Sequence, residues 1–244
     1  GQPDLRLHPI HEFSKWYSAA MKRKSLISKW NQNKKTRYSV FENQLCNYLN
    51  ATRGLHIKPK NVISTRSTEM SLYIISQLLI RPKEVVLVGN LSNYAANMIF
   101  QQSGASIKKI PVDEQGLNVD YIRTHFTKGA IRCVYICTNR DYPTTVSLSA
   151  ERRLKLLQLA KEYQFAIIED DYDHEFHYDS RPIPPLISLP SADKVIHIGS
   201  LSKVFAPSLR VGYVVADLNI IHAMKQDILL IDKQGNAITE LAIA

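Results

Sequence analysis

The chain contains little cysteine. Only three of its 244 residues are cysteines, Cys46, Cys133 and Cys137, and their spacing matches no metal-binding pattern, so we expect no metal centre. This usage is typical of a reducing environment and predicts a cytoplasmic protein. Cys133 and Cys137 lie in or beside a strand-like run, and we interpret them as small core residues.

Long apolar runs are also lacking. No stretch approaches the roughly 18 consecutive apolar residues of a membrane-spanning helix, and we expect neither a signal peptide nor a membrane partner. There is no internal repeat and no low-complexity linker. The remaining composition, 45% hydrophobic and 22% charged, is that of an ordinary globular domain.

Acidic residues are fewer than basic ones. The 31 Lys and Arg residues against 22 Asp and Glu residues give a formal net charge of +9. This charge fits either a nucleic-acid ligand or a small anionic ligand together with a basic surface. No basic region carries helix-turn-helix or zinc-finger spacing. We therefore expect no direct nucleic-acid binding by this chain and interpret most of the charge as a solvated basic face.

The apolar pattern predicts an α/β fold. Strands are predicted at residues 85–88, 131–137, 165–168, 195–198 and 211–215, and helices at 70–79 and 150–163. Near-continuous β-branched strands separated by helices are typical of a mostly parallel sheet covered on both faces.

The organisation along the chain predicts two regions. Residues 1–55 read as a helical and extended segment that leads into a large domain over residues 56–244. Residues 236–244 read as the start of a helix, so we expect a large domain truncated at its C-terminus and belonging to a longer protein.

Lys203 lies between two apolar strands, where a lysine is unfavourable unless an amine is needed. Ser200 and Ser202 precede it, and Arg210 follows seven residues later. Hydroxyls and a guanidinium indicate an anion beside the amine. An amine next to an anion site is what a pyridoxal phosphate Schiff base requires.

The strand at 165–168 is followed by four acidic residues in five positions, Glu169, Asp170, Asp171 and Asp173. Ligands of open α/β sheets bind at the carboxyl ends of the strands. Like charges so close together repel, so we expect at least one of them to have a cationic partner. A protonated pyridine nitrogen is one such partner, and a metal ion or a solvated acidic turn are the alternatives. A second, weaker anion site is predicted at residues 64–69, where hydroxyls open a helix.

These residues resemble a known family. The runs at 168–179 and 199–213, with Pro143-Thr144, the run at 149–153 and Pro3-Asp4-Leu5-Arg6, are similar to fold-type I pyridoxal phosphate enzymes of the class I/II aminotransferase group. More narrowly, they resemble the aminotransferase-like domain of MocR-type regulators of the GntR family. The resemblance covers the chain from about residue 3 to its end. It implies the three-layer αβα large domain of these enzymes, with a mostly parallel central sheet.

The resemblance also implies a role for individual residues. Lys203 would form the Schiff base with pyridoxal phosphate, Asp170 would pair with the pyridinium nitrogen, and Tyr172 would hydrogen-bond the phenolic oxygen of the ring. Tyr94 would stack on the ring, although Tyr94 and Tyr172 also fit a reading as ordinary packing aromatics. The phosphate would be held by Ser200, Ser202, Arg210, Ser67 and Thr68, and Tyr38 would reach the phosphate of a neighbouring subunit in a homodimer.

The sequence departs from the family pattern in four places. Thr145 stands where a glycine usually follows the Pro-Thr pair, and Arg140-Asp141 replaces a His-Gln pair. Ser92-Asn93 replaces the Pro-Gly before Tyr94, and the phosphate loop, usually glycine-containing, reads Arg66-Ser67-Thr68-Glu69. Glycines in such loops allow positive φ and close backbone approach. We also expect the winged helix-turn-helix domain of a MocR regulator and the C-terminal small domain of the enzymes to be absent from this sequence.

Three functions follow from these observations. The first is a pyridoxal phosphate-binding, effector-sensing domain of a GntR/MocR-type transcriptional regulator, in which a small amino compound displaces Lys203 and DNA is bound through a separate N-terminal domain. The second is a catalytic aminotransferase, in which Lys203 also moves the α-proton. The third is a dimerisation module that has lost the cofactor.

Overall fold

The structure is a computed structural model that describes residues 6, 9–23, 34–175, 183–205, 207–232 and 236–244, without the side chains of 34–39 and 207. The family-like residues 3–5 and 176–179 lie outside the described residues. The chain divides into two compact units. The first unit comprises Gly1–Ser67 and Ser200–Ala244, and the second comprises Thr68–Gly199. The boundary expected between residues 55 and 56 stays a prediction.

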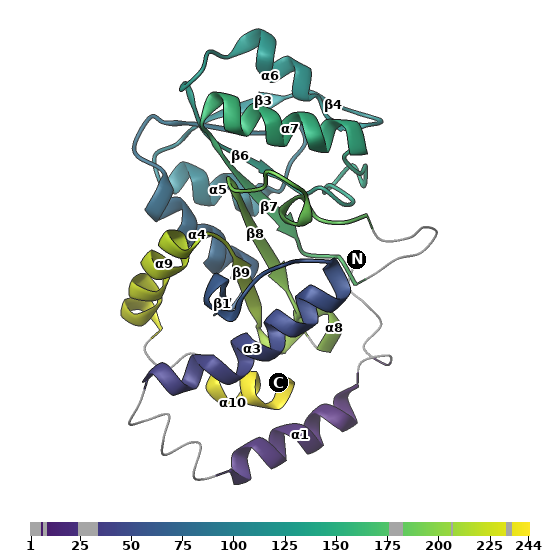
Figure 1. Ribbon diagram of the computed structural model, residues 1–244, viewed down its shortest axis with the longest axis vertical. Helices are drawn as coiled ribbons and strands as arrows, with labels where there is room; N and C mark the ends of the chain where they lie inside the picture. The colour runs from purple at the N-terminus through teal and green to yellow at the C-terminus, as the bar shows by residue number, and fades with distance from the viewer. Residues whose placement is uncertain (1–5, 7–8, 24–33, 176–182, 206, 233–235) are drawn as a thin grey trace. The chain divides into compact units, whose positions relative to one another are not determined.

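The central sheet has seven strands within the described residues, in the order β1-β9-β8-β7-β6-β2-β3 (Figure 1). Their bounds are β1 (Val62–Thr65), β2 (Val85–Gly89), β3 (Ser106–Ile110), β6 (Ile131–Ile136), β7 (Ala166–Asp171), β8 (Val195–Ser200) and β9 (Gly212–Val215). The strands β8, β7, β6, β2 and β3 run parallel to one another, whereas β1 is antiparallel to β9. The predicted α/β class with a mostly parallel sheet is confirmed.

The second unit has helices on both faces of its strands. Helices α6 (Val119–His125) and α7 (Ala150–Tyr163) share an apolar core with residues of the strands, among them Leu87, Val134 and Ile167. Helices α4 (Thr68–Leu79) and α5 (Tyr94–Gln102) belong to the other face, where the Phe100 ring of α5 lies 5.6 Å from the Tyr135 ring of β6. A short hairpin, β4 (Val112–Asp113) with β5 (Gly116–Leu117), and the 3-10 turn η3 (Leu186–Ser188) complete this unit.

The first unit is built around the antiparallel pair of β1 and β9, in which Val62 lies opposite Val215 and Thr65 opposite Gly212. Its helices are α1 (Ile10–Lys22), α3 (Lys34–Arg53), α8 (Ser202–Phe205), α9 (Leu218–Ile231) and α10 (Ala237–Ile243), with 3-10 turns η2 (Pro59–Asn61) and η4 (Pro207–Leu209). Helices α1 and α10 lie side by side (Figure 1).

The predicted elements are all present, with shifted ends. The helix at 150–163 has the predicted bounds, because Ser149 caps it by accepting from the Arg152 N–H. Strand β7 is longer than predicted and runs through Asp171, because parallel pairing with β8 continues from Ile167 opposite Val195 to Asp171 opposite Gly199. The acidic residues 169–171 therefore lie in the strand and not after it. Strand β3 was not predicted, since Lys108 and Lys109 interrupt its apolar pattern at the edge of the sheet.

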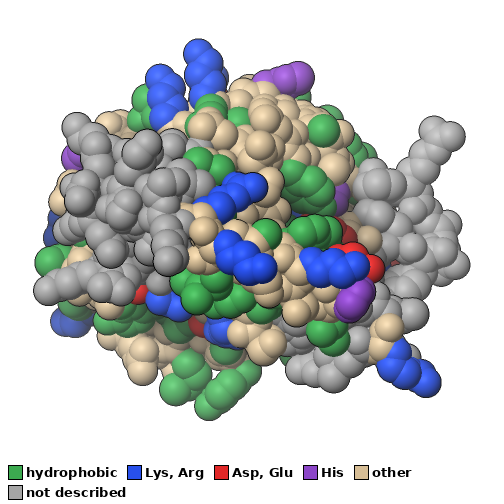
Figure 2. All heavy atoms as spheres, turned by 90° about the horizontal axis from the view of Figure 1, so that it is seen from below, with side chains coloured by type: hydrophobic (Ala, Val, Ile, Leu, Met, Phe, Trp, Pro, Cys, Tyr) green, Lys and Arg blue, Asp and Glu red, His purple; other side chains and the backbone are tan. Residues whose placement is uncertain are grey.

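The positive charge is spread out on the face seen in Figure 2. There the Lys and Arg side chains of described residues stand in several separate places, with hydrophobic and other side chains between them. Among the described residues, no helix has both the length and the apolar character needed to cross a membrane.

Candidate functional site

Strand β7 distributes its acidic residues over two faces, because successive side chains of a strand point to opposite sides. Glu169 and Asp171 point to the α7 side, where both act electrostatically on the buried guanidinium of Arg153 from α7. Asp170 points to the α4 and α5 side, where it meets Tyr135 of β6. One run of like charges in the sequence thus becomes two separate environments.

Glu169 is satisfied by protein groups. Its Oε1 accepts hydrogen bonds from the Thr138 hydroxyl and the Leu186 N–H, both at 2.7 Å. Its Oε2 accepts from the Ile187 N–H at 3.3 Å and lies 3.0 Å from His197 Nδ1. These contacts fasten β7 to the neighbouring strands and to η3, so Glu169 has a structural role.

The next two acids of this run also have basic side chains as partners. Asp171 Oδ2 lies 2.9 Å from His174 Nδ1, and Asp173 Oδ2 lies 3.3 Å from Arg140 Nε. The chain itself therefore supplies the cationic partner that the acidic cluster was expected to need. The described residues contain no group of three or more His, Cys, Asp or Glu side chains arranged to hold a metal ion.

Asp170 differs from these three. It is 2% exposed, and its Oδ2 accepts a hydrogen bond from the Tyr135 hydroxyl at 2.8 Å. Within the described residues, no group donates a hydrogen bond to its buried Oδ1. Burial raises the pKa of Asp170 to about 7, and the charges of Asp171 and Glu69 add to the rise. An N–H placed at Oδ1 would satisfy this oxygen, so Asp170 fits a protonated pyridine nitrogen.

The two predicted aromatic contacts differ in burial. Tyr94 begins α5 and is 74% exposed, so its ring is not a core packing residue. Tyr172 follows β7 directly and is half-buried, and its hydroxyl donates to the Arg140 carbonyl at 3.2 Å. Burial raises the pKa of Tyr172 above its usual range, so the phenol stays neutral and can donate a hydrogen bond.

Two departures from the family pattern keep the local backbone. Thr145 has φ 61° and Arg140 has φ 46°, the left-handed region that a glycine adopts without strain. A β-branched residue thus stands here in a backbone conformation that favours glycine. Asn93, in place of the usual glycine, caps α5, because its Oδ1 accepts from the N–H groups of Ala95 and Ala96.

Lys203 lies in the first unit on α8, a short helix where the sequence predicted a loop. The hydroxyls of Ser200 and Ser202 donate to the Val211 carbonyl at 3.4 and 3.3 Å, and Ser202 Oγ accepts from the Val211 N–H at 3.0 Å. These hydrogen bonds join the residues before and at the start of α8 to the backbone of Val211. They hold the lysine in a half-buried position at the end of β8.

At the second predicted anion site, Gly212 of β9 lets its backbone lie close to the backbone of residues 65–67. A Cβ at this position would lie 2.8 Å from Thr65 Oγ1 and 2.9 Å from the Ser67 carbonyl carbon. The glycine that admits the 65–67 segment is therefore on β9 and not in the loop itself. Ser67 is buried, and the neighbouring Arg66 makes a bidentate pair with Asp232, Nε to Oδ2 at 2.5 Å and Nη2 to Oδ1 at 3.0 Å.

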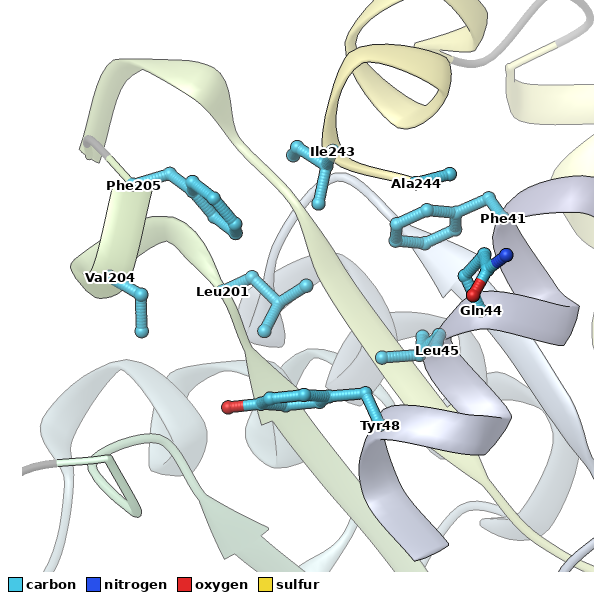
Figure 3. A pocket seen from close by; sticks show the side chains of 9 residues that line it. All are labelled: Phe41, Gln44, Leu45, Tyr48, Leu201, Val204, Phe205, Ile243 and Ala244. Carbon is cyan, nitrogen blue, oxygen red and sulfur yellow. The ribbon is translucent and has the colours of Figure 1, made fainter. Parts of the chain in front are cut away.

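The first unit contains two cavities near these residues. One, of about 520 Å³, is bordered by the guanidinium groups of Arg66 and Arg210 and by polar and aromatic side chains of α1 and α10. The other, of about 250 Å³, is mostly apolar. Figure 3 shows Phe41, Leu45 and Tyr48 of α3 pointing into it towards Leu201 and Phe205. Helix α8 thus turns apolar residues to this second cavity.

The predicted site residues are divided between the two units. The first unit contains Ser67, Ser200, Ser202, Lys203 and Arg210, and the second contains Thr68, Tyr94, Asp170 and Tyr172. Thr68 is the first residue of α4 and is half-buried. Tyr38 lies on α3, and its side chain lies outside the described part of the chain.

Sequence reasoning missed Tyr135 and His197, the partners of Asp170 and Glu169. The period of two along a strand indicates which residues share a face, but identifying a partner on another strand also needs the register between the strands. Since Ile136 of β6 lies opposite Glu169, the odd-numbered Tyr135 and Cys137 share a face with Asp170, and a diagonal tyrosine reaches the carboxylate. His197 lies opposite Glu169 in the parallel pairing of β7 with β8. Without the register between strands, neither partner was identifiable.

The chain is similar to known proteins over nearly its whole length. The family model described as aminotransferase class I and II matches residues 7–230. The probable rhizopine catabolism regulatory protein MocR of Rhizobium meliloti is 26% identical over 229 residues, which are 93% of this chain and 45% of that protein. Aromatic-amino-acid aminotransferase 1 of Thermococcus litoralis is 26% identical over 186 residues, 74% of this chain and 45% of the enzyme.

The chain is also similar to a solved aminotransferase structure. The crystal structure of an archaeal alanine:glyoxylate aminotransferase superposes with a TM-score of 0.87 at 28% identity, over 99% of this chain and 60% of that one. The chain thus spans less than half the length of the two relatives named above. The resemblance read from the sequence motifs is confirmed.

Proposed function

Because the chain belongs to the class I and II aminotransferase family, we propose that it binds pyridoxal phosphate and senses a small amino compound as the effector domain of a GntR/MocR-type transcriptional regulator. The observation that carries the proposal is the buried Oδ1 of Asp170, which no described group satisfies. The similarity to MocR over 93% of this chain supports the regulatory role. DNA binding by a separate N-terminal domain is part of the proposal.

Each predicted site residue would supply one kind of contact to the cofactor. Lys203 provides the primary amine, Arg210 with Ser200, Ser202, Ser67 and Thr68 provides donors for the phosphate, and Tyr94 provides an exposed ring for stacking. When bound, pyridoxal phosphate supplies an aldehyde that reacts with amines and a pyridine ring that withdraws electrons.

Asp170 and Tyr172 would tune the ring electrostatically. Asp170 would hold a proton on the pyridine nitrogen. A cation at its Oδ1 lowers the pKa of this carboxyl from about 7, so the carboxylate is ionised once the site is filled. Tyr172 would donate a hydrogen bond from its neutral hydroxyl to the phenolic oxygen. An incoming amine would then take the place of Lys203, and the change at α8 is the event the regulator would sense.

The direct test is the absorbance of the protein after incubation with pyridoxal phosphate. We expect a band near 400–430 nm, roughly where a protonated, conjugated imine absorbs, and its loss on borohydride reduction. The variant K203A should lack the band. The matched control K161A, which removes an exposed lysine of α7, should keep it.

Peptide mapping after reduction then identifies the modified lysine. Label found on Lys203 supports the proposal. A wild-type protein without the band, or label that is spread equally over surface lysines, would sink the cofactor part of the proposal and leave the dimerisation module as the better reading.

A catalytic aminotransferase is the second candidate, favoured by the match to the alanine:glyoxylate aminotransferase at 28% identity. Its test uses the full-length native protein, loaded with cofactor and mixed with single amino acids. Release of the matching keto acid in one half-reaction supports catalysis. A spectral change without keto acid supports sensing alone.

We also propose that the protein acts as a homodimer, in which Tyr38 of one subunit serves the phosphate site of the other. Sedimentation equilibrium of the full-length protein tests the assembly. The variant Y38F should weaken cofactor binding without changing the oligomeric state, and a monomeric wild-type protein that binds the cofactor would contradict this assignment.

A further inference from the structure

The larger cavity of the first unit has the dimensions of a small-molecule site. Its volume of about 520 Å³ lies within the roughly 300–1,000 Å³ that is usual for such sites. Its lining residues come from four segments, which are α1, the residue after β1, the segment at η4 and the start of α10. It shares no lining residue with the mostly apolar cavity of this unit. A ligand in it would meet several kinds of side chain at once.

Helix α1 forms one wall of this cavity. Ile10, Phe13, Ser14, Tyr17 and Ser18 line it, and their spacing of three and four residues places them on one face of the helix. The rings of Phe13 and Tyr17 lie 5.8 Å apart. The apolar face of a helix is usually buried against the core, but here Ile10 is 56% exposed and Tyr17 is 37% exposed. This wall therefore offers apolar and aromatic surface to a ligand.

The charged side chains that line the cavity are both cationic. Arg66 follows β1, and Arg210 follows η4. Among the described residues, no Asp or Glu lines the cavity. Its other polar groups are hydroxyls and the amide of Asn236, all of which can donate a hydrogen bond to an anion. The lining therefore complements a negatively charged group next to an apolar one.

Asp232 holds the guanidinium of Arg66 in a fixed orientation. Nε donates to Oδ2 at 2.5 Å, and Nη2 donates to Oδ1 at 3.0 Å. A guanidinium carries five N–H groups in one plane, so it can bind a carboxylate of the protein and a carboxylate of a ligand together. A side chain that the protein already orients loses less conformational entropy when a ligand binds.

The segment that carries Arg210 is joined to α10. The Asn236 amide donates to the Leu209 carbonyl at 2.9 Å, and the buried Thr239 of α10 also lines the cavity. Glu240 acts electrostatically on Arg66 as well, but it is buried, accepts a hydrogen bond from the Ser64 hydroxyl at 2.9 Å and does not line the cavity. Contacts within the protein thus form the cationic side of the cavity.

We propose that this cavity binds a small organic carboxylate with an aromatic group, the carboxylate at Arg66 and the ring against Phe13 and Tyr17. Arg66, Arg210 and Asp232 together carry one net positive charge, which matches a monoanion. Arg210 is also a predicted contact of the cofactor phosphate, so Arg66 is the residue particular to this site. That the ligand is the effector rests on the proposed function, whereas the binding site itself does not.

Three matched compounds test the ligand class by isothermal titration calorimetry on the full-length native protein. The first, 3-phenylpropanoate, has both the carboxylate and the ring. The second, 3-phenylpropan-1-ol, lacks the charge, and the third, propanoate, lacks the ring. We expect each of the last two to bind at least about tenfold more weakly than 3-phenylpropanoate, because one loses the charge-assisted hydrogen bonds and the other the buried ring area. Equal affinity for all three compounds, or no binding of 3-phenylpropanoate, would overturn the proposal.

A pair of tryptophan variants on α1 locates the binding site. Ser14 lines the cavity and Lys15 does not, and both side chains are exposed, so neither substitution disturbs the core. S14W should fill the cavity and abolish binding of 3-phenylpropanoate. K15W adds the same side chain one position further along and should keep the wild-type affinity within about twofold, as expected of an exposed site outside the contact. Binding that survives S14W, or that K15W weakens equally, would contradict the assignment.

The double variant R66Q/D232N tests the anchor for the carboxylate. It removes both charges of the pair, so the net charge is unchanged and no carboxylate is left without a partner. We expect 3-phenylpropanoate to bind at least about tenfold more weakly, since a hydrogen bond from a charged donor is lost. Unchanged affinity in a double variant with the wild-type circular dichroism spectrum would refute the role of Arg66. If the double variant does not fold, the two tryptophan variants decide.

These results are independent of the absorbance test for the cofactor. If the native protein fails to form the band while S14W abolishes binding of 3-phenylpropanoate and K15W does not, the carboxylate site stands and the cofactor assignment falls. If the band forms and 3-phenylpropanoate does not bind, the cofactor assignment stands and the carboxylate site falls.

Discussion

The two faces of β7 carry carboxyl groups that differ in their hydrogen-bond partners. On the α7 side, Glu169 has four protein partners, three donors and His197, and Asp171 has His174. On the α5 side, Asp170 has the Tyr135 hydroxyl on one oxygen and no described donor on the other. Both oxygens of Glu169 thus have protein partners, whereas one oxygen of Asp170 has no described donor. The two carboxyls, adjacent in one strand, therefore differ in how fully the protein satisfies them.

The largest effect is expected from E169Q. The glutamine amide cannot accept all the hydrogen bonds that Glu169 accepts, and it removes the charge next to His197. Breaking a buried hydrogen-bonded charge network of this kind costs about 3 kcal/mol. Urea denaturation should show this loss in the free energy of unfolding. If E169Q were as stable as the wild type, the contrast between the two faces of β7 would be wrong.

On the other face of β7, the corresponding amide variant D170N should raise the free energy of unfolding at high pH. The pKa of Asp170 is raised from 3.8 to about 7 in the folded protein, so its contribution to stability is complete below about pH 4 and is lost as the pH rises through 7. The asparagine variant does not titrate. We expect D170N to be as stable as the wild type near pH 5 and more stable at pH 9, on the order of 2 kcal/mol.

Urea denaturation at several pH values measures this difference. The control is the same series on E169Q, which should stay destabilised at every pH. A D170N protein whose stability follows the wild-type pH profile would show that Asp170 does not titrate in this range.

Y135F removes the hydrogen-bond donor that Asp170 has within the described residues. Loss of the phenolic donor leaves the second oxygen of a buried carboxylate unsatisfied, which costs about 1–2 kcal/mol where the carboxylate is ionised. The pKa of Asp170 should rise further, because the hydrogen bond from Tyr135 lowers it. Stability should therefore fall at pH 8 and change little at pH 5. Equal losses at both pH values would point to packing against Phe100 instead.

The smallest effect is expected from T145G, in the loop that follows β6. A β-branched residue at φ 61° is strained, and glycine adopts this conformation freely. We expect the variant to be about 0.5–1 kcal/mol more stable. V146G, a control at a neighbouring residue that is not among those with positive φ, should lower stability. A destabilised T145G would mean that the threonine stabilises the folded loop by more than its strained backbone costs.

Much of the fold was predictable from the sequence. The strands at 85–88, 131–137 and 195–198 and the helix at 150–163 have strong apolar periods, and they are present close to their predicted ends. Strand β3 was missed because an edge strand needs few apolar residues, and its lysines hide the pattern. The extension of β7 was missed because pairing with β8 overrides the acidic composition of residues 169–171.

Local sequence therefore determined the α/β class, the order of the elements and the identity of Lys203 and Asp170 as candidates, because hydrophobic period and short motifs are properties of neighbours along the chain. Only the tertiary structure decided which tyrosine reaches Asp170 and which oxygen of this carboxyl has no described donor. Those facts depend on the register between strands, which brings Tyr135 and Asp170, 35 positions apart, within 2.8 Å. Hydrogen bonding and desolvation act over a few ångströms of space, so the state of Asp170 is set by neighbours that the linear sequence does not place beside it.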